Sequence, residues 1–110
     1  MSGSPEPRKG SRAAGPGVHE ARLRLDHART SRLAQLHALD GTDRDAADPL
    51  MAVQAEAVRR VLTEIDEAFA RVEDGSYGRC VGCAKPVAAE RLEILPYTRY
   101  CVTCQRHAAG

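Results

Sequence analysis

Every cysteine of this chain lies in one of two Cys-x-x-Cys pairs, and seventeen residues separate the two pairs. Zinc binds four ionised thiolates in a tetrahedron, and two such turns brought together provide that geometry. Gly82 lies within the first pair, where a tight turn lets backbone N–H groups point toward the sulfurs. We therefore expect one structural Zn²⁺, bound by Cys80, Cys83, Cys101 and Cys104.

Two other uses of the four cysteines compete with zinc. Two disulfides would be typical of a secreted domain, and the N-terminus has no hydrophobic signal core. A switch based on thiol oxidation or zinc release is a further alternative. A thioredoxin-like redox site, however, has a single Cys-x-x-Cys motif beside a strand-helix-strand pattern, and this chain shows neither feature. A site closed by four thiolates leaves no position for a substrate water, so we expect a protein that is not an enzyme.

The composition favours helices packed side by side. The chain has 110 residues but only one Phe, three Tyr and no Trp, and its apolar residues are mostly Ala, Leu and Val. The formal net charge of +1 gives no long-range attraction to nucleic acid, so strong direct DNA binding is not expected. No apolar run approaches the length of a membrane span. We expect a cytoplasmic protein without a membrane partner.

The chain divides into a tail, a pair of helices and a cysteine-containing module. Residues 1–17 are rich in Ser, Gly and Pro, and we expect a disordered tail. Residues 18–39 contain no Gly or Pro and predict a helix whose apolar stripe is imperfect, because Arg32 interrupts it. Its histidines are too far apart to form an i, i+4 ligand pair, so we expect them to be solvated.

The second helix has the clearest pattern in the chain. Asp48 followed by Pro49 is a helix start, and Gly75 supplies the left-handed residue after a helix ending at Asp74. Apolar residues recur at heptad spacing, with only Gln54 polar among them. The first helix carries four Arg against two acids, and the second three Arg against six acids. The predicted fold is therefore mainly α, with an antiparallel two-helix coiled-coil hairpin over residues 18–74; pairing between two chains is the alternative.

An acidic loop at residues 40–48 joins the two helices, with four Asp against one Arg. Asp48 has a capping role, but Asp40 and Asp43 have no such role, and a loop displaying several carboxylates suffers self-repulsion. We interpret this loop as a functional tip of the hairpin.

Residues 75–110 form the predicted zinc module. A short helix is expected over Val87–Ile94, ended by Pro96, and another after Cys104. We expect a small apolar core around the metal, built from Tyr77, Leu92, Ile94, Leu95, Tyr97 and Tyr100.

This arrangement resembles the bacterial DksA/TraR family of zinc-finger proteins. The resemblance rests on Gly75-x-Tyr77-Gly78 before the first cysteine pair and on Arg91-Leu92-Glu93-x-x-Pro96 between the pairs, behind a helical hairpin. It covers about residues 18–108. The second stretch makes it specific, because zinc alone does not require that sequence.

The resemblance implies a transcription regulator that binds bacterial RNA polymerase. In that family the hairpin enters the secondary channel of the polymerase and places acidic tip residues near the active centre, often together with the alarmone ppGpp. The family's tip pattern Asp-x-x-Asp-x-Ala corresponds to Asp40, Asp43 and Asp45, so its alanine is an aspartate here. The resemblance assigns no residue to ppGpp.

A nucleic-acid-binding zinc module is the alternative from another class. Residues 75–110 carry five basic and two acidic side chains, and four thiolates around Zn²⁺ add two negative charges. The resulting charge of about +1 is not the footprint of a DNA-binding surface.

Overall fold

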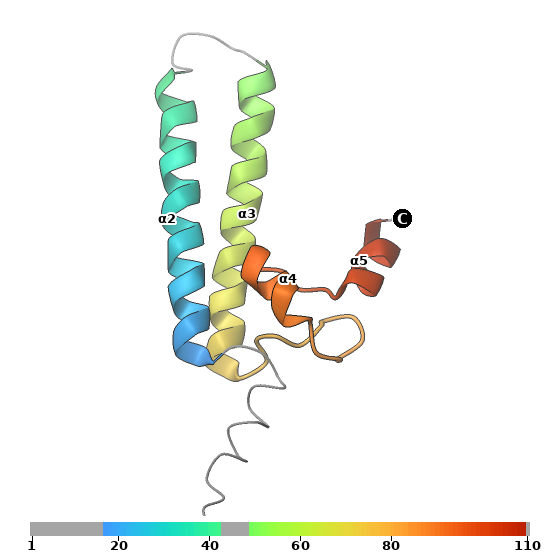
Figure 1. Ribbon diagram of the computed structural model, residues 1–110. Coiled ribbons are helices and arrows are strands. Elements are labelled where there is room, and N and C mark those ends of the chain that lie inside the picture. The colour runs from blue at the N-terminus through green and yellow to red at the C-terminus, as the bar shows by residue number, and fades with distance from the viewer. Residues whose placement is uncertain (1–16, 43–48, 110) are drawn as a thin grey trace, which may run out of the picture.

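The computed structural model describes residues 17–42 and 49–109 (Figure 1). Two long helices, α2 (Val18–Thr42) and α3 (Pro49–Asp74), lie side by side as an antiparallel hairpin. Two short helices follow, α4 (Ala89–Ile94) and α5 (Val102–Ala109). Within the described ranges there is no strand, only an isolated antiparallel bridge between Arg79 and Pro86. The mainly helical fold class is therefore confirmed.

The ends of α3 follow from local sequence signals. The helix begins at Pro49 and ends at Asp74, as predicted, whereas the expected cap Asp48 lies outside the described residues. Gly75 adopts a φ of 87°, and the N–H groups of Ser76 and Tyr77 donate to the Arg71 carbonyl at 3.0 and 3.1 Å. Both bonds go to one carbonyl, that of Arg71, which the last helical turn would otherwise leave without a partner.

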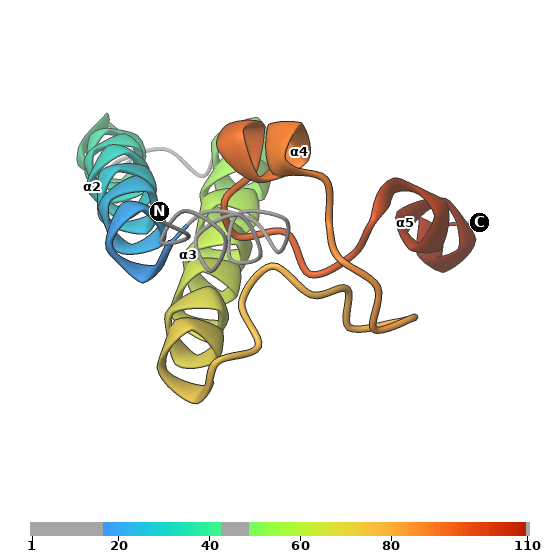
Figure 2. The same ribbon diagram turned by 60° about the horizontal axis from the view of Figure 1, so that its bottom comes forward.

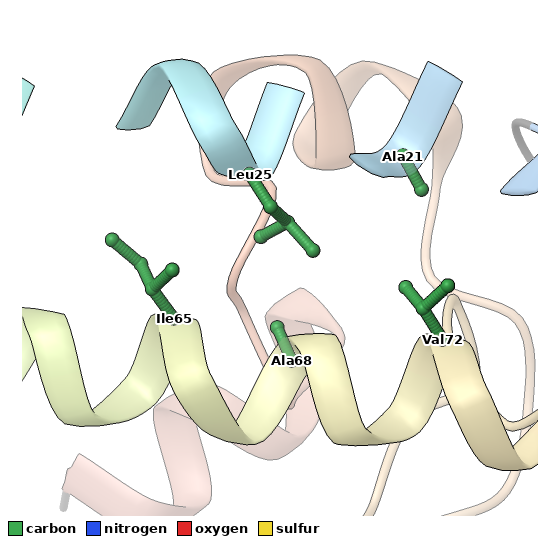
Figure 3. Packing of buried hydrophobic residues seen from close by; sticks show 5 residues of the cluster. All are labelled: Ala21, Leu25, Ile65, Ala68 and Val72. Atoms are coloured by element: carbon green, nitrogen blue, oxygen red, sulfur yellow. The ribbon is translucent and has the colours of Figure 1, made fainter. Parts of the chain in front are cut away.

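The core of the hairpin lies near its base, where the zinc module joins it. Figure 3 shows Leu25 of α2 pointing between Ile65 and Ala68 of α3, and Ala21 facing Val72. Ile65, Ala68 and Val72 recur at three- and four-residue steps and therefore share one face. The predicted apolar stripe of α3 is confirmed at these positions. Gln54, the polar member of the predicted heptad pattern, is exposed, and the next residue, Ala55, is buried instead.

The stripe predicted for the first helix is only partly correct. Ala21 and Leu25 are fully buried and Ala28 packs against them, but Leu33 keeps 49% of its surface exposed. The apolar side chains of this helix lie on more than one face: Leu23 is 55% exposed and turned away from the core. α2 also runs to Thr42, three residues beyond the predicted end.

Ion pairs join the two helices along the hairpin. Arg22 meets Glu73 at 2.6 Å, and Arg29 pairs with Asp66 while its guanidinium lies 4.7 Å from the ring centre of Phe69. These contacts agree with the opposite charges predicted for the helices. They are exposed, so each contributes at most about 1 kcal/mol, and the apolar core holds the hairpin together.

The short helices differ from prediction at their first residues. α4 begins at Ala89 rather than Val87, whose side chain is buried beside the metal site. α5 begins at Val102, so it contains Cys104 instead of following it. Cys101 acts as its cap, since its sulfur accepts from the N–H of Cys104 at 3.4 Å. In Figures 1 and 2, α4 lies beside α3 and α5 stands on the side away from α2.

Candidate metal centre

A short loop holds the first cysteine pair. The N–H of Cys80 donates to the Lys85 carbonyl at 2.8 Å, and the N–H of Ala84 donates back to the Cys80 carbonyl at 2.9 Å. Ala84 takes a φ of 67° to close this turn. The N–H of Val81 donates to the Arg99 carbonyl at 2.8 Å, so the loop is fixed beside the second pair.

The four predicted ligands come together. The sulfur atoms of Cys80, Cys83, Cys101 and Cys104 all lie within 4.8 Å of one another. Zn–S bonds of 2.3 Å in a tetrahedron place neighbouring sulfurs about 3.8 Å apart. The sulfurs of Cys83 and Cys101 are 3.9 Å apart. The donor set and its spacing therefore fit one zinc ion in a structural site.

Gly82 allows the two cysteine pairs to approach each other. Its N–H donates to the Cys80 sulfur at 3.3 Å, as predicted for a turn that supports thiolates. A side-chain carbon at this position would lie 3.1 Å from the Cys104 sulfur, which is closer than ordinary contact. A side chain at this position would therefore press against a ligand sulfur, which would have to shift by a few tenths of an ångström.

Hydrogen bonds among the cysteines shift the pKa values of Cys80 and Cys104 in opposite directions. Burial raises the pKa of Cys80, but hydrogen bonds from the backbone N–H groups of Cys101, Cys83 and Gly82 and from the Cys104 thiol lower it to about 6. The pKa of Cys104 is raised to about 12, chiefly because its thiol donates to the sulfurs of Cys80 and Cys101. A bound Zn²⁺ supplies the positive charge that stabilises all four thiolates together.

A small apolar core surrounds the site. Val87 and Leu92 are buried with Cys80, and Tyr77 and Tyr100 pack against them. The predicted places of Tyr77, Leu92 and Tyr100 are therefore confirmed. Ile94 was wrongly assigned to this core, because it is 77% exposed at the end of α4. Tyr97 packs instead against the core of the hairpin.

Residues 95–100, the connecting segment, join the metal site to the hairpin. Arg71 of α3 donates to the carbonyls of Tyr97 and Thr98, both at 3.4 Å. The Tyr77 hydroxyl donates to the Pro96 carbonyl at 2.7 Å. Burial, followed by the nearby charge of Arg99, lowers the pKa of Arg71. The sequence analysis missed Arg71, since no local pattern marks an Arg that binds carbonyls about 26 residues away.

Asp40 is the predicted tip residue that the structure describes, and it lies at the opposite end of the hairpin from the cysteines. Asp40, in the last turns of α2, is 3.5 Å from Arg59 of α3, and 56% of its side chain is exposed. This ion pair gives Asp40 a partner that the sequence did not indicate. Asp43 and Asp45 lie outside the described residues.

The described ranges offer no further metal or membrane site. In residues 17–42 and 49–109, the four cysteines form the sole cluster of metal-ligating side chains. His19, His27 and His37 are exposed, as predicted, and His107 is exposed as well. Over the same ranges, no helix is both long and apolar enough to cross a bilayer.

The fold and the site define a zinc-finger protein in which a four-cysteine module sits at the base of a helical hairpin. Residues 75–107 match the family model of the prokaryotic dksA/traR C4-type zinc finger. Over these residues the chain therefore matches the zinc finger of the DksA/TraR family, which confirms the resemblance for this part of the chain.

Two curated relatives each match less than half of the chain. The RNA polymerase-binding transcription factor DksA of Caulobacter vibrioides is 44% identical over 50 residues, which cover 44% of this chain and 35% of the relative. General stress protein 16O of Bacillus subtilis is 38% identical over 50 residues, covering 46% and 31%. The matched segment thus spans about a third of either relative.

A solved structure extends the likeness in fold to the hairpin. Transcription factor DksA2 from Pseudomonas aeruginosa superimposes with a TM-score of 0.52, covering 84% of this chain and 77% of that one. The two sequences are 22% identical, so this likeness concerns the fold alone.

Proposed function

We propose that this protein is a zinc-containing transcription regulator that binds bacterial RNA polymerase through protein contacts. The observation that carries the proposal is the combination of a DksA/TraR zinc finger with a helical hairpin whose base it adjoins. The Caulobacter relative with that zinc finger is named as a polymerase-binding transcription factor. The protein is proposed to work in the cytoplasm, where the polymerase is.

The hairpin is proposed to enter the secondary channel with its acidic tip toward the active centre. α2 has 25 residues and is about 38 Å long at 1.5 Å per residue, which separates the tip from the zinc module. Asp40, Asp43 and Asp45 are the proposed acting residues. Carboxylates in a confined channel interact with a catalytic cation far more strongly than in bulk water, because the effective dielectric constant is lower.

The zinc site has a structural task in this proposal. Four cysteine sulfurs surround the metal position, so zinc would keep no open position for a substrate, and the protein acts without catalysis of its own. The connecting segment links the module to α3 through Arg71, which orients the hairpin relative to the zinc finger. The alarmone ppGpp is a proposed co-ligand at the polymerase interface.

Protein contacts fit the module better than direct binding to DNA. Of its basic side chains, Arg91 donates to the Tyr100 carbonyl at 3.0 Å, and Arg99 pairs with Glu67 at 3.3 Å. Side chains that are committed to internal bonds are less available for phosphates. A strongly salt-dependent shift of short duplex DNA would favour the nucleic-acid alternative.

Competition for purified core RNA polymerase tests the proposal. The zinc-loaded chain should bind at micromolar concentration and be displaced by a known secondary-channel factor. The double variant D40N/D43N should keep its binding and lose its effect on transcription in vitro. D26N/E90Q removes two exposed carboxylates away from the tip and should behave like the wild type.

Each outcome has a distinct meaning. Absence of binding, or binding without competition, would refute the polymerase proposal. Competitive binding with an unchanged transcription profile in D40N/D43N would refute the tip mechanism while leaving the binding site in place.

A further inference from the structure

The zinc finger is attached to the hairpin without a broad helix interface. Among the described helices, α2 and α3 alone share an extended contact, so α4 and α5 do not pack along the hairpin. In both Figure 1 and Figure 2, α5 stands clear of the two long helices. The angle between the finger and the hairpin is therefore set by individual side-chain contacts.

Tyr77 connects the end of α3 to the connecting segment. Its backbone belongs to the helix end, because its N–H donates to the Arg71 carbonyl at 3.1 Å. Its hydroxyl donates to the Pro96 carbonyl at 2.7 Å, and the two residues are nineteen positions apart in the chain. Its half-buried ring packs against the hairpin core and against the core beside the metal. One side chain thus contacts both parts of the molecule and the segment between them.

The Tyr77 hydroxyl keeps its proton at neutral pH and remains a hydrogen-bond donor. Burial raises the pKa of Tyr77, and the nearby guanidinium groups of Arg24 and Arg71 oppose that shift only in part. The bond to Pro96 is partly buried, so removal of the hydroxyl leaves this carbonyl with poor access to water as a substitute partner.

The other polar contacts between the two parts are longer or more exposed. Arg71 reaches two carbonyls of the connecting segment at 3.4 Å, which is long for a hydrogen bond. Arg99 lies 3.3 Å from Glu67, and Arg24 lies 3.9 Å from Glu93. Both carboxylates are exposed, and exposed ion pairs are weak because water and salt screen them.

We propose that Tyr77 is the main positioning residue that fixes the angle between the zinc finger and the hairpin, and that Arg71 supports it. Apolar contacts, such as that of the Tyr97 ring with the hairpin core, hold the two parts together but are non-directional. A short hydrogen bond is directional and therefore selects one orientation. This inference concerns the protein alone and does not rest on the proposed binding to RNA polymerase.

Residual dipolar couplings measured by NMR on the full zinc-loaded chain test the proposal. In the wild type, amide couplings from the two long helices and from residues 75–107 should fit one alignment tensor, because the angle between the parts is fixed. Y77F removes the hydroxyl alone. In this variant the alignment of the finger should fall by about a fifth or more relative to that of the hairpin, because the finger becomes mobile. Y77F/R71M should show a larger fall.

Y97F is the matched control. It removes the hydroxyl of a neighbouring tyrosine whose hydroxyl has no hydrogen-bond partner in the described part of the chain, and it keeps the ring on the hairpin core. Its couplings should fit one tensor, as in the wild type. In Y77F, the finger couplings taken by themselves should still fit the structure of the finger, and the zinc content should remain one ion per chain.

Four results would overturn the proposal. The first is that Y77F still fits one tensor, and the second is that Y97F loses alignment as much as Y77F does. The third is that R71M alone lowers the alignment of the finger more than Y77F does, since Arg71 would then be the main positioning residue. The fourth is that the finger couplings of Y77F no longer fit the finger itself, because Tyr77 would then maintain the internal fold of the finger rather than its angle.

Discussion

Replacing Leu25 by alanine is the most direct test of the packing that forms the hairpin. Leu25 is fully buried between Ile65 and Ala68, so truncation leaves a hole that neighbouring side chains cannot fill. Loss of its apolar transfer free energy amounts to about 2.4 kcal/mol. The cavity term raises the expected loss in the free energy of unfolding to about 3 kcal/mol.

Leu23 provides a matched control on the same helix. L23A removes the same atoms from a side chain that is more than half exposed, so its effect should stay below about 0.5 kcal/mol. Urea unfolding of the zinc-loaded chain, followed by circular dichroism, measures both variants. With a slope near 1–2 kcal/mol per molar, L25A should lower the midpoint by about 1.5–3 M.

Two results would refute this reasoning. Equal losses in L25A and L23A would mean that the buried face of α2 is misassigned. A loss for L25A that shrinks as the protein concentration rises would mean that α2 pairs with a second chain, which is the alternative that the heptad pattern alone leaves open.

Three further perturbations address the metal and its attachment. A zinc chelator should unfold residues 75–107 before the hairpin, because the hairpin has its own apolar core. Amide protection from hydrogen exchange should be lost in that order. Simultaneous loss of protection in both parts would contradict this prediction. R71M should speed exchange in the connecting segment and destabilise the protein by about 1–3 kcal/mol, whereas the exposed control R60M should not. Hydrogen bonds from Ser76 lower the pKa of Asp74, so the contribution of Asp74 to stability is present above the unfolded pKa and is lost as the pH falls through the folded value. In D74N the melting temperature should therefore fall less steeply as the pH is lowered. A fall equal to that of the wild type would exclude this role.

The sequence was most informative where one local signal sets one structural outcome. Proline and glycine mark the two ends of α3, and each acts through its own backbone. The spacing of the cysteines likewise determines the ligand set, since four thiolates have few structural uses in one small module.

Other features depend on contacts between distant segments and could not be predicted. α2 carries apolar residues on more than one face, so its periodicity did not separate the buried Leu25 from the exposed Leu33. The outward turn of Ile94 follows from how α4 sits on the hairpin, which no local pattern encodes. The start of α5 was missed because a cysteine sulfur, rather than a usual capping oxygen, accepts the N–H of Cys104, the third residue of the helix.

The distribution of the three tyrosines makes the chain its own spectroscopic reporter. Tyr97 packs against the hairpin core, Tyr100 against the core beside the metal, and Tyr77 contacts both. With no tryptophan in the sequence, tyrosine emission is not masked by a stronger fluorophore. Single Tyr-to-Phe variants therefore allow the melting of the hairpin, the melting of the zinc finger and the separation of the two to be followed by fluorescence without an added label.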